Sequence, residues 1–236
     1  MKSVKFRMIA IALLSATMPF TAKAQDKVEA SVGADFVSNY IWRGTDCGGV
    51  SIQPSMGVSY KGLSLAAWGS VGIDKEDARE IDLTLGYNTG GFNVSVTDYW
   101  FSYHKEDGGY TGDYFKYGAH STIHIFEATL GYDFGPLALS WNTYFAGDDY
   151  TKENGDRAYS TYVGISAPFK LGGLDWSAEV GLTPWEGAYA NKFNVTNLTL
   201  KAEKEIKFTN SFSLPTFAQV TFNPHTQGAY FVFGVS

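Results

Sequence analysis

The chain has 236 residues, of which 44% are hydrophobic, 16% aromatic and 18% charged, and its formal net charge is −6. Low charge combined with many aromatic residues excludes an intrinsically disordered chain. The single cysteine excludes a disulfide scaffold, and the acidic balance lacks the basic surface typical of nucleic-acid binding. Despite its aromatic content, the chain has no long apolar run after its first 25 residues.

Residues 1–24 have the three-part pattern of a secretory signal peptide. A positive start is followed by a short apolar segment and by the small-x-small cleavage site Ala22-Lys23-Ala24. The alternative is a retained membrane anchor, but the apolar segment is too short and a proline interrupts it. We therefore expect a cleaved leader and one mature domain over residues 25–236. In that domain 14 basic residues stand against 24 acidic ones, a formal charge of −10.

From residue 28 onwards, apolar and polar residues alternate with a period of two, which is the pattern of β-strands with two different faces. Val50, Ile52 and Met56, for example, alternate with small or polar residues. Phase slips near Thr97 and Asn197 are interpreted as β-bulges. The alternation predicts an all-β fold with twelve strands, over residues 28–42, 50–60, 63–73, 80–88, 92–103, 121–134, 137–146, 158–169, 174–185, 193–204, 212–222 and 228–236.

The connections between these strands alternate in length. Tight turns such as Lys61-Gly62 and Gly135-Pro136 alternate with longer, more charged connections such as 104–120 and 147–157. This asymmetry is typical of outer-membrane proteins, and the strand length suits a tilted membrane crossing. We therefore expect an antiparallel up-and-down transmembrane β-barrel in the bacterial outer membrane, inserted by the barrel assembly machinery and in contact with membrane lipids and lipopolysaccharide. A secreted β-sandwich, or two small stacked barrels, is the alternative.

In such a barrel the polar positions of each strand line the lumen. We expect Arg43, Glu80 and Asp82 to form an ionic cluster near the extracellular mouth, either as a brace for the wall or as a gate. An excess of lumen carboxylates predicts a narrow, cation-biased passage for small solutes or ions. A plugged barrel without conductance is the alternative for this width. The lumen positions predicted from strand parity are the charged residues Arg43, Glu80, Asp82 and Asp98 and the aromatic residues Trp68 and Trp100.

The segment Val37-Ser38-Asn39-Tyr40-Ile41-Trp42-Arg43-Gly44 resembles the opening strand of the TorF-type porins, a family of uncharacterised outer-membrane β-barrel proteins. The segments Ala67-Trp68-Gly69-Ser70 and Glu80-Ile81-Asp82-Leu83 follow with a similar spacing. The resemblance covers roughly residues 28–104 and, beyond them, the rhythm of strands and turns. It implies an exported outer-membrane barrel of porin type with no established substrate. The chain departs from many outer-membrane proteins by ending in Ser236 instead of an aromatic residue.

Two other function classes remain as alternatives. An outer-membrane lipid-modifying enzyme needs a nucleophile with a histidine base, but no GxSxG motif accompanies the four histidines, His104, His120, His124 and His225. We therefore expect no enzyme and no catalytic residue. The second alternative is a non-conducting barrel whose loops bind a partner, for which the tyrosine-rich stretch 108–117 is a candidate; the same stretch is also a candidate constriction.

No cofactor or metal is predicted. The acidic stretch 148–156 lacks the spacing and the closing glutamate of an EF-hand loop, and is interpreted as a solvated surface loop. Cys47, in the first predicted extracellular connection, is interpreted as a free thiol.

Overall fold

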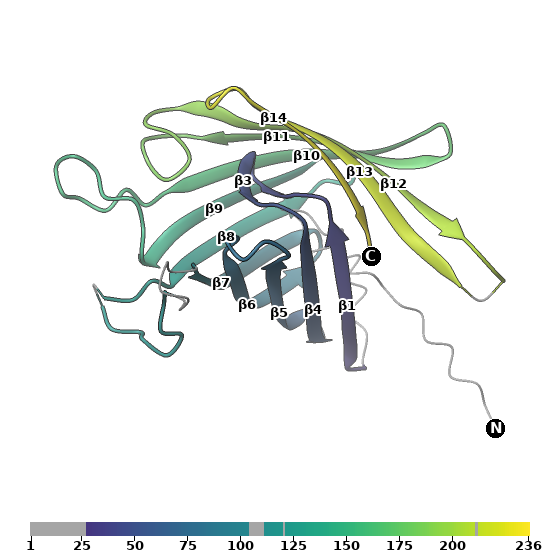
Figure 1. The fold of residues 1–236 in the computed structure, drawn as a ribbon, viewed down its shortest axis with the longest axis horizontal. Helices are drawn as coiled ribbons and strands as arrows, with labels where there is room; N and C mark the ends of the chain where they lie inside the picture. Colours follow the sequence, from purple (N-terminus) through teal and green to yellow (C-terminus); the bar gives the residue numbers. More distant parts are fainter. Residues whose placement is uncertain (1–26, 104–110, 120, 211) are drawn as a thin grey trace.

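The structure is a computed structural model that describes residues 27–103, 111–119, 121–210 and 212–236. The described residues contain fourteen strands, and twelve of these close into an antiparallel barrel in which each strand pairs with its neighbours along the chain (Figure 1). No helix in this part of the chain is long and apolar enough to cross a membrane. The predicted signal peptide and its cleavage site lie outside the described residues.

The first six barrel strands are β1 (Glu29–Val37), β4 (Ser51–Tyr60), β5 (Leu63–Gly72), β6 (Arg79–Thr89), β7 (Phe92–Ser102) and β8 (Ile125–Asp133). The second six are β9 (Ala138–Gly147), β10 (Thr161–Leu171), β11 (Leu174–Thr183), β12 (Asn194–Lys207), β13 (Ser213–Asn223) and β14 (Gly228–Val235). The remaining two strands, β2 (Tyr40–Trp42) and β3 (Thr45–Gly48), pair only with each other.

The predicted twelve-stranded antiparallel barrel is confirmed. The largest difference concerns the first strand, which ends at Val37 instead of continuing to residue 42. The chain bends at residues 38–39, and the next residues fold back on themselves as the β2–β3 hairpin. Residues 40–42, predicted to be the end of the first barrel strand, therefore belong to a separate hairpin. Its second strand, β3, lies in what was predicted to be a loop.

One of the two predicted bulges is present. The ladder between β11 and β12 shifts register at Gly181 and Leu182, opposite Thr196, which confirms the bulge expected near Asn197. The bulge expected at Thr97 is wrong, because β7 pairs in unbroken register with β6 and with β8 through that residue. The parity of β7 therefore does not change along its length.

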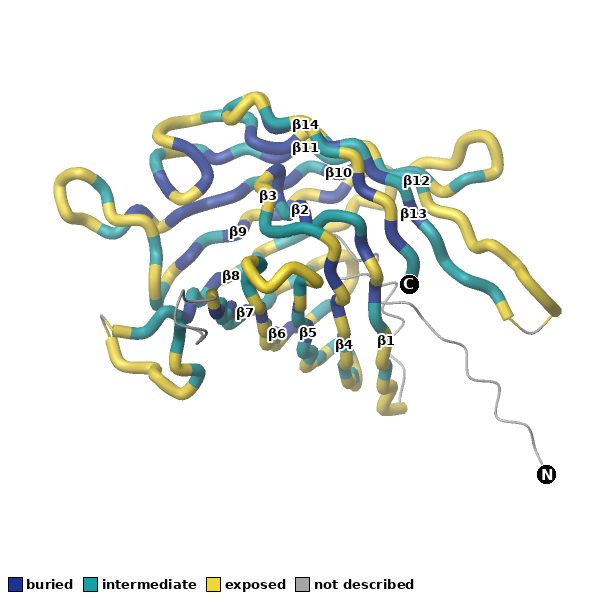
Figure 2. Tube along the Cα trace, in the orientation of Figure 1, coloured by how far each residue is buried: buried dark blue, intermediate teal, exposed yellow. Residues whose placement is uncertain are grey.

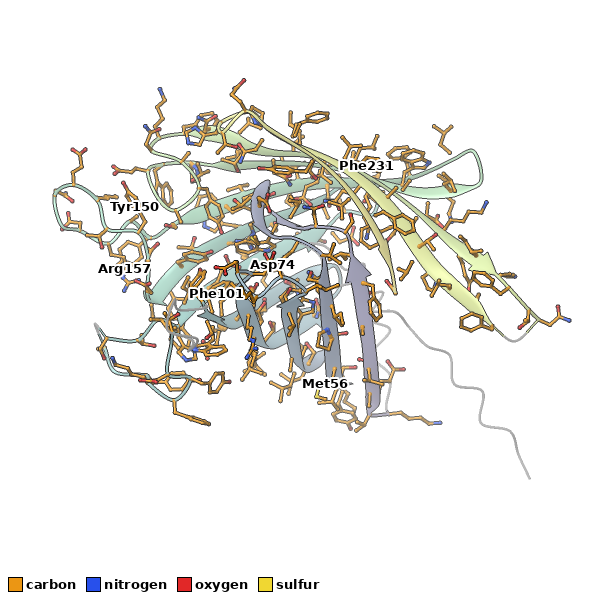
Figure 3. The ribbon with its side chains drawn as sticks, viewed as in Figure 1. Met56, Asp74, Phe101, Tyr150, Arg157 and Phe231 are labelled. Carbon is orange, nitrogen blue, oxygen red and sulfur yellow. The ribbon has the colours of Figure 1, made fainter. Side chains whose placement is uncertain are left out.

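The outer face of the barrel is apolar. Residues that pair directly across neighbouring strands point to the same face of the sheet. On the outer face of the barrel, every strand carries exposed apolar side chains. Met56 and Phe231, labelled in Figure 3, are 61% and 68% exposed. Figure 2 shows the alternation of exposed and more buried residues along the strands. Other members of this outer set include Val32, Leu65, Leu85, Val94, Leu130, Trp141, Phe169, Val180, Leu200 and Phe222.

The barrel closes along a short seam. β1 pairs with β4 over its whole length, but with β14 only at Phe36 and Val37. The backbone N–H of Ser38 extends this contact by donating to the carbonyl of Phe233 at 2.9 Å. Closure therefore lies at the end of β1 from which the β2–β3 hairpin emerges, while β1 and β13 diverge at the other end (Figure 1).

Candidate functional site

The β2–β3 hairpin turns at Arg43 and Gly44, whose φ angles are 51° and 80°. Two residues with positive φ are what a type I′ hairpin turn requires. Glycine is needed at position 44, because a Cβ there would overlap the carbonyl oxygen of Thr196 on β12. Arginine is unusual in this backbone region, which disfavours side chains with a Cβ. The turn thus presses the backbone of the hairpin against the barrel wall and places an arginine at its tip.

The Arg43 side chain forms a buried ion pair with Glu127 of β8. Its two terminal nitrogens donate to the two carboxylate oxygens, Nη1 to Oε2 at 2.5 Å and Nη2 to Oε1 at 2.9 Å. Arg43 is 5% exposed and Glu127 is 1% exposed. This bidentate geometry is the strongest form of contact between a guanidinium and a carboxylate. It ties the tip of the hairpin to the inner wall.

Aromatic side chains surround the pair. The guanidinium carbon lies 4.2 Å from the ring centre of Trp42 and 4.7 Å from that of Tyr162. The hydroxyl of Tyr189 accepts a hydrogen bond from Arg43 Nη1 at 2.5 Å and donates to Tyr144 at 3.1 Å. Burial raises the pKa of Tyr189 to about 12, so this hydroxyl stays protonated at neutral pH. Cation–π contacts of this kind add to the ion pair where water is excluded.

A second carboxylate lies beside this cluster. Tyr162 donates its hydroxyl hydrogen to Glu179 Oε1 at 2.5 Å. Asn197 donates to the Tyr162 hydroxyl at 2.9 Å and to the same glutamate oxygen at 3.0 Å. The bulge opposite Gly181 lies next to Asn197 in β12, so an irregularity of the sheet accompanies this network.

The hairpin contacts the other sides of the barrel as well. Tyr40 packs on Trp68 of β5, with ring centres 5.5 Å apart. Ile41 is buried with Phe217 and Val232 of β13 and β14. Asn223 donates its side-chain hydrogen to the carbonyl of Gly44 at 3.0 Å. Because contacts reach β5, β8, β10, β13 and β14, the hairpin lies across the lumen and narrows it at this level.

Four of the six predicted lumen residues have inward-facing side chains. Glu80 hydrogen-bonds to Tyr40 of the hairpin, and Asp82 pairs across the ladder with Trp68. Arg43 is also inside, but not at the end of the first barrel strand and not paired with Glu80 or Asp82. That expected cluster is corrected: the hairpin carries Arg43 across the lumen to Glu127 instead.

Asp98 and Trp100 are on the outer face, and their predicted lumen positions are wrong. In the ladder Asp98 pairs with Leu83 and Trp100 with Ile81, both of which belong to the exposed apolar set. The assumed bulge at Thr97 would have turned them inward, and the unbroken register leaves them outside. Residues 111–119 and 121–124, which we call the outer strap, cover them: the ring of Tyr114 packs on Trp100 at 5.4 Å.

Asp98 is the centre of a small network under the outer strap. His124 Nδ1 lies 2.6 Å from Asp98 Oδ1, and Tyr117 donates to Asp98 Oδ2 at 3.2 Å. The other ring nitrogen of His124 lies 2.7 Å from the carbonyl oxygen of Tyr114. Both ring nitrogens of His124 are therefore in polar contact, one with a strand carboxylate and one with a backbone carbonyl of the outer strap.

The other candidate residues are dispersed. His225 contacts Asn194 at 3.0 Å, while His104 and His120 lie outside the described residues. No group of three metal-ligating side chains occurs in the described part of the chain. Of the tyrosine-rich stretch 108–117, the structure describes residues 111–117, which lie in the outer strap.

Two residues of the cluster were not anticipated. Tyr99 of β7 donates a hydrogen bond to Glu127 Oε1 at 3.0 Å, but the bulge expected at Thr97 would reverse its parity and turn it outward. Tyr189 lies in a connection, where strand parity gives no direction. The only local signal for the hairpin is Gly44 directly after Trp42-Arg43, a glycine where the strand pattern would continue.

Comparison with known protein families, with curated proteins and with solved structures finds no match for this chain. The resemblance to the TorF-type porins stays a prediction.

Proposed function

We propose that the chain is an outer-membrane β-barrel. The support is the apolar outer face, which covers every side of a closed antiparallel barrel and is far larger than the apolar patches of soluble monomers. The antiparallel ladders around the barrel pair most of the backbone groups that a lipid environment leaves unsatisfied, and β1 meets β14 at the short seam. The resemblance to the TorF-type porins supports the same proposal. Co-fractionation of the protein with outer membranes, and its extraction only by detergent, are the expected results.

Within that membrane we propose a narrow passage for small cations, constricted by the β2–β3 hairpin. The observation that carries the proposal is the Arg43–Glu127 pair, which holds the hairpin across the lumen. Arg43 neutralises one carboxylate, while Glu80 and Asp82 face the same lumen as neighbours on β6. Rings of carboxylates favour cations in pores of this kind.

Planar-bilayer recordings test the passage. We expect a small single-channel current whose reversal potential in a KCl gradient favours K⁺. Glu80→Gln combined with Asp82→Asn should reduce that preference, whereas Asp98→Asn, on the outer face, should leave it unchanged. Arg43→Ala should increase the conductance, because the tip of the hairpin loses its anchor. Anion preference of the parent protein, or absence of current in both the parent and Arg43→Ala, would contradict the proposal.

A further inference from the structure

The guanidinium of Arg43 is recognised mainly by groups outside the hairpin. Both terminal nitrogens bind the carboxylate of Glu127 on β8, at 2.5 and 2.9 Å. The ring of Tyr162 on β10 lies 4.7 Å from the guanidinium carbon, and Tyr189 accepts a hydrogen bond at 2.5 Å. A forked carboxylate contact combined with aromatic faces is also the chemistry by which proteins bind free organic cations.

The fit covers the end of the arginine side chain but not its stem. Arg43 Nε is buried and has no hydrogen-bond partner among the described residues. The Arg43 backbone has a φ of 51°, in the left-handed region that costs energy for a residue with a Cβ. The surrounding residues therefore satisfy the terminal guanidinium nitrogens, but not the Nε atom or the backbone of Arg43.

We propose that the lumen contains a binding site for a small organic cation with a guanidinium or alkylammonium group, and that Arg43 is its tethered occupant. The proposal rests on the proposed function only for the route by which such a cation reaches the lumen. Glu127 binds the nitrogens of the cation. Tyr99 holds the carboxylate by donating a hydrogen bond to Oε1 at 3.0 Å, and the rings of Tyr162 and Tyr189 cover the faces of the cation.

The charges around the site favour a cation even when Arg43 withdraws. Glu179 lies next to Tyr162, to which it is hydrogen-bonded, and interacts electrostatically with Arg43. Asp82 on β6 interacts electrostatically with Glu127. Without a cation, three carboxylates would share a region shielded from water, which is unfavourable for their charged forms. A solute that replaces the guanidinium would remove that cost.

Removal of the tethered occupant tests the site. The Arg43→Ala variant should melt at a lower temperature than the parent, because Glu127 loses its counter-ion while buried. Methylguanidinium at ten times its dissociation constant should raise the melting temperature of this variant by about 3–6 °C, with saturation. Methylurea, a neutral molecule of the same shape, and NaCl at equal concentration should give no saturable rise. The parent protein should respond less, because Arg43 occupies its site.

The matched control is the double variant Arg43→Ala/Glu127→Gln, which has similar space but lacks the carboxylate and should not respond. Equal responses of the single and double variants, or equal effects of methylguanidinium and methylurea, would overturn the proposal. If Arg43→Ala does not fold alone, its yield after refolding with either compound becomes the readout, and equal yields overturn the proposal. Neither readout depends on conduction, so failure here is distinguishable from failure of the proposed passage.

Discussion

Two long connections of this barrel fold onto opposite faces of the same wall. The first connection, with β2 and β3, enters the lumen and brings Arg43 to Glu127 of β8. The outer strap stays outside and brings His124 to Asp98 of β7. Each cluster contains a buried nitrogen-bearing side chain, a strand carboxylate and at least one tyrosine that donates to that carboxylate. The two clusters use similar side chains. Glu127 points inward and Asp98 outward, and this direction decides whether the cluster forms inside or outside the barrel.

The two clusters differ in the number of hydrogen bonds to their carboxylates and in how deeply they are enclosed. Glu127 accepts three hydrogen bonds, two from Arg43 and one from Tyr99, and the pair lies among the rings of the lumen. Asp98 accepts one hydrogen bond from Tyr117 and contacts His124, under a covering of one loop segment. We therefore expect the inner pair to control both stability and passage, and the outer pair to control only the position of the strap.

The largest expected effect is that of Glu127→Ala. Arg43 would remain buried without its counter-ion, a change that typically costs about 3–5 kcal/mol of unfolding free energy. The loss is measured by denaturant unfolding of the folded barrel in lipid vesicles, and conductance should rise in the same sample. The double variant Arg43→Met/Glu127→Met, which replaces the pair by apolar side chains, should recover most of the lost stability. A double variant as unstable as Glu127→Ala would contradict this account of the pair.

A smaller effect is expected for Asp98→Ala on the outer face. His124 and the Tyr117 hydroxyl lose an acceptor, which costs about 1–3 kcal/mol for a buried group. Trypsin cleavage after Lys116 in the outer strap should become faster, while single-channel conductance and ion preference stay unchanged. A change of conductance comparable to that of Glu127→Ala would show that the two clusters are coupled through the wall.

The turn of the hairpin offers a third contrast. Gly44→Ala adds a methyl group that overlaps the Thr196 carbonyl, whereas Gly155→Ala meets open space in a surface loop with a similar φ of 86°. Both variants bear the strain of positive φ, so their difference isolates the contact of the hairpin with the wall. We expect Gly44→Ala to be less stable by about 1 kcal/mol or more, since backbone atoms adapt poorly to overpacking. Equal unfolding free energies would place the hairpin away from β12.

The features of the fold that depend on neighbouring residues can be predicted from the sequence. Strand positions follow from the period-two pattern, and with them the inward direction of Glu80, Asp82 and Trp68, because each side chain alternates relative to its neighbour. The apolar and polar positions of β7 exchange places after Thr97. Either a bulge or a loop that covers polar residues of the outer face explains this exchange, and the sequence of β7 is compatible with both. The choice depends on Tyr117 and His124, which lie 19 and 26 residues from Asp98 along the chain.

The position of Arg43 is likewise set by distant residues. Residues 37–42 alternate as a strand would, but the chain leaves the barrel after Val37. The residues that hold Arg43 inside the lumen, Glu127 and Tyr189, lie 84 and 146 residues away from it along the chain. The alternation within β8 places Glu127 on the inner face but gives no reason to pair it with Arg43. A connection that folds into the lumen contacts strands on the far side of the barrel. The spacing of residues along the chain therefore does not predict which strand residues it contacts.

Cys47 in β3 gives the smallest measurable effect and reports directly on the hairpin. Burial, and then the nearby carboxylates of Glu80 and Asp46, raise the pKa of its thiol above the ordinary value. Because the thiolate is the reactive form, maleimide labelling at pH 8 should be at least about tenfold slower than for an exposed thiol. The rate should rise with pH without reaching a plateau at pH 9. The comparison thiol is Glu153→Cys in a Cys47→Ser background, since Cys47 is the only cysteine of the chain.

Labelling of Cys47 then separates the inner cluster from the outer one. Glu127→Ala should accelerate it, because a hairpin without its anchor moves the half-buried Cys47 thiol further into solvent and lowers its pKa towards the ordinary value. Asp98→Ala should leave the rate at that of the parent, since the outer strap lies on the other face of the wall. If both variants accelerate labelling equally, the barrel loosens as a whole and the Arg43–Glu127 pair is not a specific anchor. If neither does, the contacts of Tyr40 and Ile41 hold the hairpin without the ion pair.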